Sequence, residues 1–266
     1  MNDARIDAQY STGLSRRNIE QALITAGKDL GHLQPADLGP LEDFHTLGRI
    51  ATSQLAELAK ITSEDAVLDA GSGIGGTARF LADQYRCRVT AIDLTEEYCE
   101  TARWLNQLTR LDDRISVRQG DVTDLPFADA SFDVVTSQHV QMNVADKTRL
   151  YREARRVLAR GGRLAIWDIT AGPPGELDYP LPWADNEQSS FVESREQYTK
   201  LLSSAGFVVE RDEDRTAALA SAGPPAPGSL TPGDLFGAGF AERVGNNLAA
   251  TRAGILSPVL IVARAV

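Results

Sequence analysis

Glycines and carboxylates stand at three points where the sequence predicts that a strand ends. Gly71 and Gly73 follow the first of these strands, Asp93 ends the second and Asp121 follows the third. Glycines let the backbone approach a ligand closely, because no side chain stands between them. Asp93 lies 22 residues beyond Gly71, a spacing that suits a carboxylate accepting both ribose hydroxyls. The Asp121 carboxylate can accept from the exocyclic amine of adenine, while the N–H of Val122 donates to a ring nitrogen. The pattern predicts a nucleotide-sized site.

The glycine turn alone leaves two kinds of cofactor open. Gly71, Gly73 and Gly76 satisfy the GxGxxG pattern of dinucleotide-binding enzymes, so an NAD-dependent oxidoreductase is one interpretation. Against it, Asp69 stands two residues before the first glycine, and the Tyr-x-x-x-Lys pair of many such enzymes is absent from the sequence. The residues around the turn must therefore decide between the alternatives.

A regular alternation of strands and helices begins at residue 66 and must position these groups. The predicted strands are 66–70, 88–93, 115–119, 132–137, 162–168, 207–212 and 257–264, and the predicted helices are 75–84, 96–108, 146–159 and 194–206. Such alternation is typical of a parallel sheet, whose ligands lie beyond the carboxyl ends of its strands. We therefore expect an α/β fold that gathers the three strand ends at one edge.

Segments outside this alternation predict a helical cap and lids. Helices are expected over 14–30 and 45–60, with Gly39-Pro40 as punctuation between them, and a further helix over about 234–249. We divide the chain into an N-terminal helical cap, 1–62, and a domain, 63–266. Two proline- and glycine-rich insertions of that domain, about 171–193 and 215–256, are expected to form lids.

The composition of the chain argues against several classes of protein. The 266 residues carry a formal net charge of −10, which argues against nucleic-acid binding because a phosphate backbone requires a basic surface. Cys87 and Cys99 form no metal-ligand cluster and suit a reducing compartment. The sequence has no run of about 18 apolar residues and its start lacks the apolar core of a secretory signal. We expect a cytoplasmic protein without metal, nucleic-acid or membrane partners.

Several ordered motifs over roughly residues 40 to 210 resemble the class I S-adenosylmethionine-dependent methyltransferases. They are Val67 to Gly76, Ile92-Asp93-Leu94, Gly120-Asp121-Val122, Phe132-Asp133-Val134-Val135 and the segment 156–164. Phe44-His45, the segment 137–143 and Pro182-Trp183-Ala184 are similar to a small-molecule branch that contains sarcosine and dimethylglycine N-methylating enzymes. The resemblance implies a Rossmann-like, seven-stranded, mostly parallel sheet with helices on both faces and an antiparallel last strand.

The resemblance also implies which residues hold the cofactor, S-adenosylmethionine, and its product S-adenosylhomocysteine. Gly71 and Gly73 would let the methionine and ribose portions approach the backbone, and Asp93 would hold the ribose. Asp69 is expected to orient the loop. The implied cofactor-binding residues are Gly71, Ser72, Gly73, Asp93, Leu94, Asp121, Val122 and Gln138.

Methyl transfer from a sulfonium is an in-line displacement, so catalysis consists chiefly of aligning the acceptor atom, the methyl group and the sulfur. A proton is removed only where the acceptor carries one. His139 follows the fourth strand, Asp168 ends the fifth, and both are candidate catalytic residues. Packing beside the cofactor is the alternative for His139, and capping of a turn is the alternative for Asp168. Asn143 stands where many relatives carry a histidine and cannot accept a proton as a base.

The acceptor pocket is expected above the ends of strands four and five, with Tyr10, His45, Asn143 and Trp183 in its wall. The predicted function is transfer of a methyl group to a nitrogen, oxygen or carbon of a small metabolite. A module of the same fold that binds cofactor without catalysis, or scaffolds a partner, remains an alternative. The expected partner is the small-molecule methyl acceptor, and a homodimer is possible.

Overall fold

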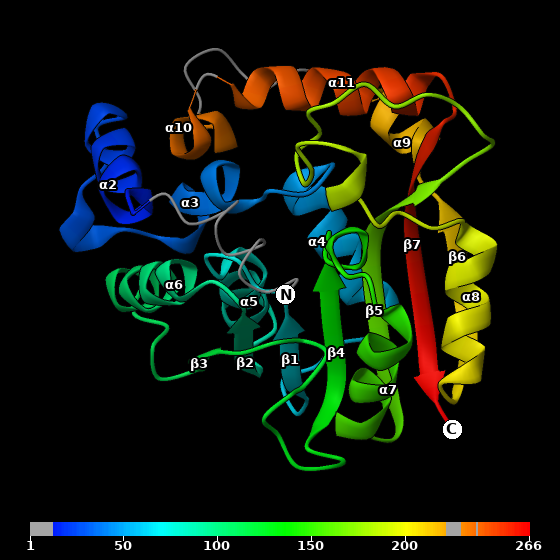
Figure 1. Ribbon diagram of the computed structural model, residues 1–266. Helices are drawn as coiled ribbons and strands as arrows, with labels where there is room; N and C mark the ends of the chain where they lie inside the picture. The colour runs from blue at the N-terminus through cyan, green and yellow to red at the C-terminus, as the bar shows by residue number, and fades with distance from the viewer. Residues whose placement is uncertain (1–12, 222–229, 238) are drawn as a thin grey trace.

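A single seven-stranded sheet runs through the computed structural model, which describes residues 13–221, 230–237 and 239–266 (Figure 1). Its order is β3-β2-β1-β4-β5-β7-β6. The strands are β1 (Ala66–Ala70), β2 (Arg88–Asp93), β3 (Ile115–Gln119), β4 (Phe132–Gln138), β5 (Leu158–Ala171), β6 (Phe207–Asp214) and β7 (Leu256–Ala265). The pairs among β1 to β5 are parallel, whereas β7 is antiparallel to both β5 and β6. The predicted mostly parallel sheet with an antiparallel last strand is confirmed.

Helices cover both faces of this sheet, and others lie beyond the carboxyl ends of its parallel strands (Figure 1). They are α2 (Ser15–Thr25), α3 (Pro35–Glu42), α4 (Gly48–Leu58), α5 (Gly76–Gln84), α6 (Glu96–Leu108), α7 (Lys147–Val157), α8 (Arg195–Ser204), α9 (Thr216–Ser221), α10 (Pro232–Phe236) and α11 (Phe240–Arg252), with short 3₁₀ turns at Leu30–His32, Gln141–Asn143 and Glu187–Ser189. Successive β4 residues point to opposite faces, so Val134 packs among side chains of α4 and α5 while Val135 packs among those of α7 and α8. This burial on both faces explains why the strands read as nearly continuous apolar runs.

The N-terminal helices gather on the side toward which the parallel strands point. In Figure 1, α2, α3 and α10 lie together there, and Leu23 of α2, Leu41 of α3 and Leu235 of α10 belong to one buried cluster. The sequence did not predict α3, because Gly39-Pro40 was interpreted as a break. The helix nevertheless runs through both residues, starting with Pro35 and a reciprocal Gln34/Asp37 capping box.

Other boundaries moved where glycine was given too much weight in one place and too little in another. Helix α7 ends at Val157 instead of 159, and Gly161-Gly162 lie inside β5, at an irregular pairing with β4. The helix predicted over 234–249 is two helices, α10 and α11, separated at Gly237, whose φ is +82°. These differences leave the strand ends, and therefore the site, where the sequence predicted them.

Candidate active site

A cavity of about 350 Å³ opens at the carboxyl ends of β1, β2, β3 and β4. This is the size of a small-molecule site. All eight cofactor-binding residues expected from the sequence line its wall, namely Gly71, Ser72, Gly73, Asp93, Leu94, Asp121, Val122 and Gln138. His45, His139 and Asn143 line it as well. The topology has therefore brought together groups that are spread over nearly a hundred residues of sequence.

The turn after β1 has a backbone that only glycine can form without strain. Gly71 has φ of +77°, and a Cβ atom there would stand 2.3 Å from Cγ2 of Val140. The N–H groups of Gly71 and Ser72 both donate to the carbonyl of Ile92, at 2.9 Å each, which ties the turn to β2. Gly73 also has a positive φ, +53°. The turn thus presents bare backbone to the cavity.

Asp93 connects this turn to the start of α6. Its Oδ2 accepts from the Gly73 N–H at 2.7 Å, and its Oδ1 accepts from the Thr95 N–H at 3.0 Å. These two backbone N–H groups hold the carboxylate in a fixed direction, as a ribose-binding group requires.

Asp121 is fixed in a similar way after β3. Its two oxygens accept from the backbone N–H of Thr123 at 2.7 Å and from the Thr123 hydroxyl at 2.8 Å. This turn keeps both Asp121 and Val122 on the cavity wall.

Asp69 lines the cavity from the end of β1 and is almost fully buried. Its Oδ1 accepts from the Thr136 hydroxyl at 3.0 Å, whereas its Oδ2 has no hydrogen-bond partner among the described residues. Burial raises the pKa of Asp69 to about 7, with the Thr136 hydrogen bond opposing that shift and nearby Asp93 adding to it. A buried carboxyl oxygen without a partner, on a residue that lines a cavity, retains the capacity to accept a hydrogen bond.

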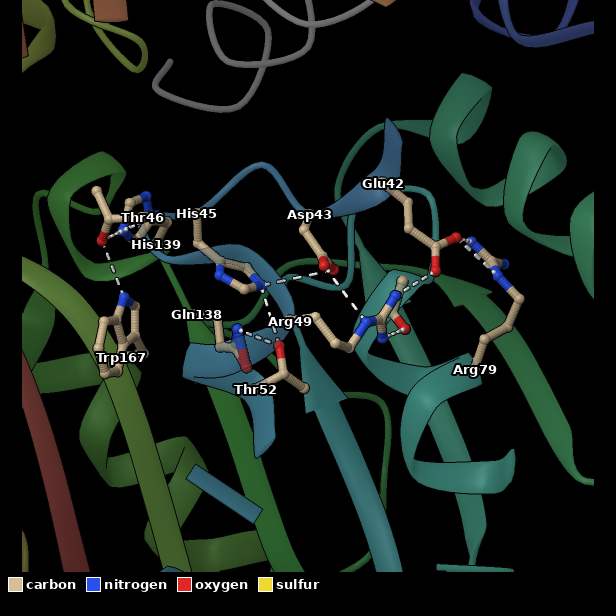
Figure 2. A network of polar contacts seen from close by, with 11 residues as sticks. Glu42, Asp43, His45, Thr46, Arg49, Thr52, Arg79, Gln138, His139 and Trp167 are labelled. Atoms are coloured by element: carbon tan, nitrogen blue, oxygen red, sulfur yellow. Dashed lines mark hydrogen bonds and ion pairs between the residues drawn. The ribbon is translucent and has the colours of Figure 1, made fainter. Parts of the chain in front are cut away.

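His139 is held by residues from two distant parts of the chain, Thr46 and Trp167, as Figure 2 shows. Its backbone N–H donates to the Trp167 carbonyl at 2.8 Å, and its φ of +55° is unusual for a side chain other than glycine. Its ring Nε2 lies 3.3 Å from Thr46 Oγ1 and 3.4 Å from the Thr46 backbone nitrogen. The Trp167 indole N–H donates to the same Thr46 hydroxyl at 3.0 Å.

These contacts fix the tautomer of His139. Because the Trp167 indole can only donate, the Thr46 hydroxyl accepts from it, and its proton and second lone pair remain for His139 Nε2. The Thr46 N–H donates to the same nitrogen, so Nε2 is an acceptor and the ring proton resides on Nδ1. Burial, together with His45 nearby, holds the pKa of His139 well below its usual range. The ring is neutral at physiological pH.

His45 belongs to a second polar network at the cavity (Figure 2). Its Nε2 lies 3.2 Å from the Thr52 hydroxyl, which also accepts from Gln138 Nε2 at 3.3 Å. Asp43 Oδ1 stands 4.0 Å from the same His45 nitrogen. Burial lowers the pKa of His45 to about 4 and raises that of Asp43 to about 7, despite Arg49 near Asp43. The His45 Nδ1 and Gln138 Oε1 atoms are buried without a described partner, so both remain able to bind a ligand.

Two residues expected in the site do not line the cavity. Asp168 is fully buried, and its Oδ2 accepts from the N–H groups of Val140 and Gln141 at 2.9 and 2.8 Å. Burial raises the pKa of Asp168 to about 7. It fixes the loop that follows β4 and does not face the cavity, so we replace the expected catalytic role with a positioning one. Trp183 is also buried, because its ring packs in an apolar cluster and its indole donates to Ser190 Oγ at 3.0 Å. Tyr10 lies outside the described residues.

Sequence reasoning missed an aromatic part of the wall. Phe44, from the segment before α4, packs edge to face on Phe236 of α10 with ring centroids 4.9 Å apart. Phe236 stacks on Phe240 at the start of α11 at 4.8 Å. All three rings line the cavity. In the sequence, Phe44 stood only as part of the Phe44-His45 motif, and Phe236 and Phe240 stood within an insertion interpreted as a lid. No strand pattern placed the three rings together.

Within the described ranges, no three His, Cys, Asp or Glu side chains lie together as metal ligands would. In that same part of the chain, no helix combines the length and apolarity needed to cross a bilayer.

Comparison with known proteins gives consistent matches. The sequence profile of a methyltransferase domain matches residues 68–166. The sarcosine/dimethylglycine N-methyltransferase of Halorhodospira halochloris is 32% identical over 200 residues, which cover 74% of this chain and 71% of that protein. The glycine/sarcosine/dimethylglycine N-methyltransferase of Actinopolyspora halophila is 32% identical over 168 residues, 63% of this chain, but the match spans only 30% of that longer protein.

A structural likeness extends over the whole chain. The geranyl diphosphate C-methyltransferase of Streptomyces coelicolor A3(2), solved with Mg²⁺, geranyl-S-thiolodiphosphate and S-adenosylhomocysteine, superposes with a TM-score of 0.69. The alignment covers 100% of this chain and 98% of that one. At 19% identity, the likeness shows that the two chains share a fold. Neither the sequence matches nor this likeness favours a dehydrogenase. With its sheet order, its glycine turn and its relatives in agreement, the chain belongs to the class I S-adenosylmethionine-dependent methyltransferases of small molecules.

Proposed function

We propose that this protein transfers the methyl group of S-adenosylmethionine to a nitrogen, oxygen or carbon of a small metabolite. One observation carries the proposal. The glycine turn, Asp93 and Asp121 follow β1, β2 and β3 in order and line a single cavity beside His139. This succession suits the amino acid, ribose and adenine parts of that cofactor, whereas a dinucleotide would need room for a pyrophosphate and a second nucleoside.

The residues present fit the cofactor. A Cβ at Gly71 would overlap Val140, so the backbone there is bare and can receive the methionine end. The unpartnered oxygens of Asp69 and Gln138 supply acceptors for its ammonium group. Asp93 would accept the ribose hydroxyls, Leu94 would pack on adenine, and Asp121 with Val122 would bind its edge. When bound, the cofactor supplies a methyl group on a positively charged sulfur, open to in-line displacement by an acceptor lone pair.

His139 would orient the acceptor molecule. Its Nε2 is already an acceptor for Thr46, so its Nδ1–H is the group that can hydrogen-bond a heteroatom of that molecule. Thr46 and Trp167 act through His139 and are positioning residues, as is Asp168 through Val140 and Gln141. His45 and Asn143 complete this side of the wall. Alignment by these groups would supply most of the catalysis.

We extend the proposal to the organisation of the chain. Residues 1–62 would act as a cap on the domain 63–266, and the insertions 171–193 and 215–256 would act as lids. In support, Phe236 of the second insertion contacts Phe44 at the cavity, and Phe240 stacks on Phe236. A cytoplasmic location, a possible homodimer and the lack of nucleic-acid or membrane partners stay predictions from composition.

Calorimetric titration with S-adenosylmethionine, S-adenosylhomocysteine and NAD tests the cofactor. We expect the first two to bind to one site per chain and NAD not to bind. Binding of NAD alone would overturn the proposal. A screen of metabolites with isotopically labelled methyl donor, read by mass spectrometry, then identifies the acceptor and the atom that is methylated.

A further inference from the structure

We infer that Arg79 is a positioning residue for the cofactor, because its buried guanidinium joins the glycine turn to the cap and so determines how tightly the turn binds its ligand. Arg79 itself does not line the cavity. The inference rests on the proposed function, since it takes S-adenosylmethionine and its product as the ligands of the cavity. It concerns the turn 71–76 and the end of the cap helix α3, which carries Glu42.

Arg79 lies at the centre of a buried hydrogen-bond network. Its side chain, on α5, is fully buried. Its Nε donates to Glu42 Oε2 at 3.0 Å, and its Nη2 donates to the same oxygen at 2.5 Å. Its Nη1 donates to Asn106 Oδ1 of α6 at 2.9 Å, and Nη2 also donates to the Ile74 carbonyl at 2.6 Å. One guanidinium group therefore joins the cap, α6 and the glycine turn.

The stability of the fold does not by itself account for this ion pair. A buried pair adds little stability over well-packed apolar side chains of similar volume, because both ions lose their hydration. A guanidinium offers direction instead, since its planar set of N–H donors holds several acceptors in one arrangement. One of the acceptors of Arg79 is the backbone carbonyl of Ile74. The role of Arg79 therefore concerns the geometry of the turn.

The turn needs support at Ile74, because glycines flank this residue on both sides. Gly73 and Gly75 have φ of +53° and +88°. Glycine populates several backbone conformations at similar cost, so local preference does not select one arrangement of the peptides around Ile74. The first half of the turn is hydrogen-bonded to β2. The bond from Arg79 supports the second half.

The cap closes directly on this second half of the turn. A Cβ at Gly76 would stand 2.8 Å from Glu42 Cγ and 3.1 Å from the Glu42 carbonyl oxygen. Arg49 of α4 donates from Nη2 to Glu42 Oε1 at 2.9 Å and from Nη1 to the Gly76 carbonyl at 3.3 Å. Figure 2 shows the guanidinium groups of Arg49 and Arg79 both directed to Glu42. The network thus anchors the turn to the cap at Ile74 and Gly76.

A shift of this half of the turn would reach the groups proposed to hold the cofactor. The Gly73 N–H donates to Asp93 Oδ2 at 2.7 Å, so movement of the adjoining Ile74 would disturb the bond to the proposed ribose-binding group. Gly73 and Gly76 also line the cavity themselves. A binding site keeps its geometry only when its supporting contacts hold it in place. Loss of the Arg79 bonds should therefore lower the affinity for the cofactor.

Calorimetric titration of the full chain with S-adenosylhomocysteine tests the inference on Arg79→Met. This variant leaves the buried Glu42 carboxylate with one partner fewer, so the double variant Glu42→Met/Arg79→Met removes both charges and should unfold at a higher urea concentration than Arg79→Met. Each variant that folds should bind S-adenosylhomocysteine at least about tenfold more weakly than the wild type. A loss of stability alone would not lower this affinity as long as nearly all of the protein stays folded.

Two further variants separate the positioning role from a structural one. Arg79→Lys keeps the charge and loses the planar set of donors, so we expect it to fold and to bind with an affinity between those of the wild type and Arg79→Met. Arg163→Met is the matched control. Arg163 pairs with Asp65 and donates to the carbonyls of Ala59 and Lys60 at 2.9 Å each, near the start of β1 at the opposite end of the sheet. Arg163→Met should lower the stability and leave the affinity unchanged.

Hydrogen exchange followed by mass spectrometry measures the turn without ligand. The amides of 71–76 should exchange faster in Arg79→Lys than in the wild type, and at the wild-type rate in Arg163→Met.

Wild-type affinity in the folded Arg79 variants, an equal loss of affinity in Arg163→Met, or unchanged exchange over 71–76 in an Arg79 variant that binds weakly would overturn the inference. If both methionine variants at position 79 fail to fold, Arg79→Lys decides alone. Failure of the wild-type chain to bind S-adenosylhomocysteine would instead refute the proposed function.

Discussion

Substitution of Gly71 by alanine tests the geometry of the turn that we propose as the cofactor end of the cavity. The new Cβ would stand 2.3 Å from Cγ2 of Val140, and the backbone φ is +77°. Val140 cannot move away freely, because its N–H donates to the buried carboxylate of Asp168. The left-handed backbone costs about 1–2 kcal/mol and the overlap about 1–3 kcal/mol. We therefore expect Gly71→Ala to lower the free energy of unfolding by about 2–5 kcal/mol.

Gly161→Ala is the matched control for the backbone cost. Gly161 has φ of +81°, but a Cβ there would meet no atom within 4 Å. We expect this variant to lose only about 1–2 kcal/mol. The double variant Gly71→Ala/Val140→Ala removes the overlapping methyl groups, and the nearest remaining side-chain atom, Val140 Cβ, would be at 3.4 Å. It should recover about 1–3 kcal/mol relative to the sum of the single changes.

The assay is urea denaturation followed by circular dichroism, with calorimetric titration of S-adenosylhomocysteine on each folded variant. Gly71→Ala should weaken that binding by at least about tenfold, because the turn must shift, while Gly161→Ala should leave it unchanged. Equal destabilisation by Gly71→Ala and Gly161→Ala, with no coupling to Val140→Ala, would refute the assignment of close packing between the turn and the loop after β4.

Three further predictions concern single groups of the site. Asp93→Ala should weaken S-adenosylhomocysteine binding by about a hundredfold in calorimetry. Asp113→Ala removes an exposed carboxylate and should leave the affinity unchanged. Equal affinities of the two variants would reject the ribose assignment. Asp69 has a raised pKa, so the stability that it contributes is fully present below about pH 4 and is lost as pH rises through about 7. In urea denaturation, the free energy of unfolding of Asp69→Asn should therefore rise by about 1–4 kcal/mol relative to wild type between pH 5 and pH 8. A fall relative to wild type would contradict the burial argument. Thr46→Val leaves the buried Trp167 indole without its acceptor and should lower the stability by about 1–3 kcal/mol in thermal denaturation. Most of that loss should be absent when the change is made in a Trp167→Phe background. A full loss in that background would show that the indole contact is not the cause.

The sheet and the cofactor side of the site could be predicted from the sequence because local signals determine them. Buried strands such as Val67-Leu68 are short apolar runs, and the residues at their carboxyl ends share one edge whatever the rest of the chain does. Gly71, Asp93 and Asp121 needed no knowledge of long-range contacts. All three line the cavity.

The acceptor side could not be predicted in the same way, because it depends on contacts between distant segments. Thr46 meets His139 and Trp167 across 93 and 121 positions of sequence, and no periodicity encodes such a meeting. Asp168 was expected at the end of its strand, but β5 continues to Ala171. The Asp168 side chain accepts from the backbone of Val140 and Gln141, which satisfies buried donors that lie far away in sequence. Helix α3 was missed because burial of Leu38 and Leu41 outweighs the local effect of Gly39-Pro40.

A crystal structure of the protein with S-adenosylhomocysteine tests the central claim most directly. The account predicts the homocysteine end on the Gly71 to Gly73 turn, the ribose hydroxyls on Asp93 and the adenine edge on Asp121 and Val122. It also predicts that the sulfur faces the part of the cavity lined by His139 and Phe236. A ligand bound in the reverse direction, with adenine on the glycine turn, or bound outside this cavity, would contradict it.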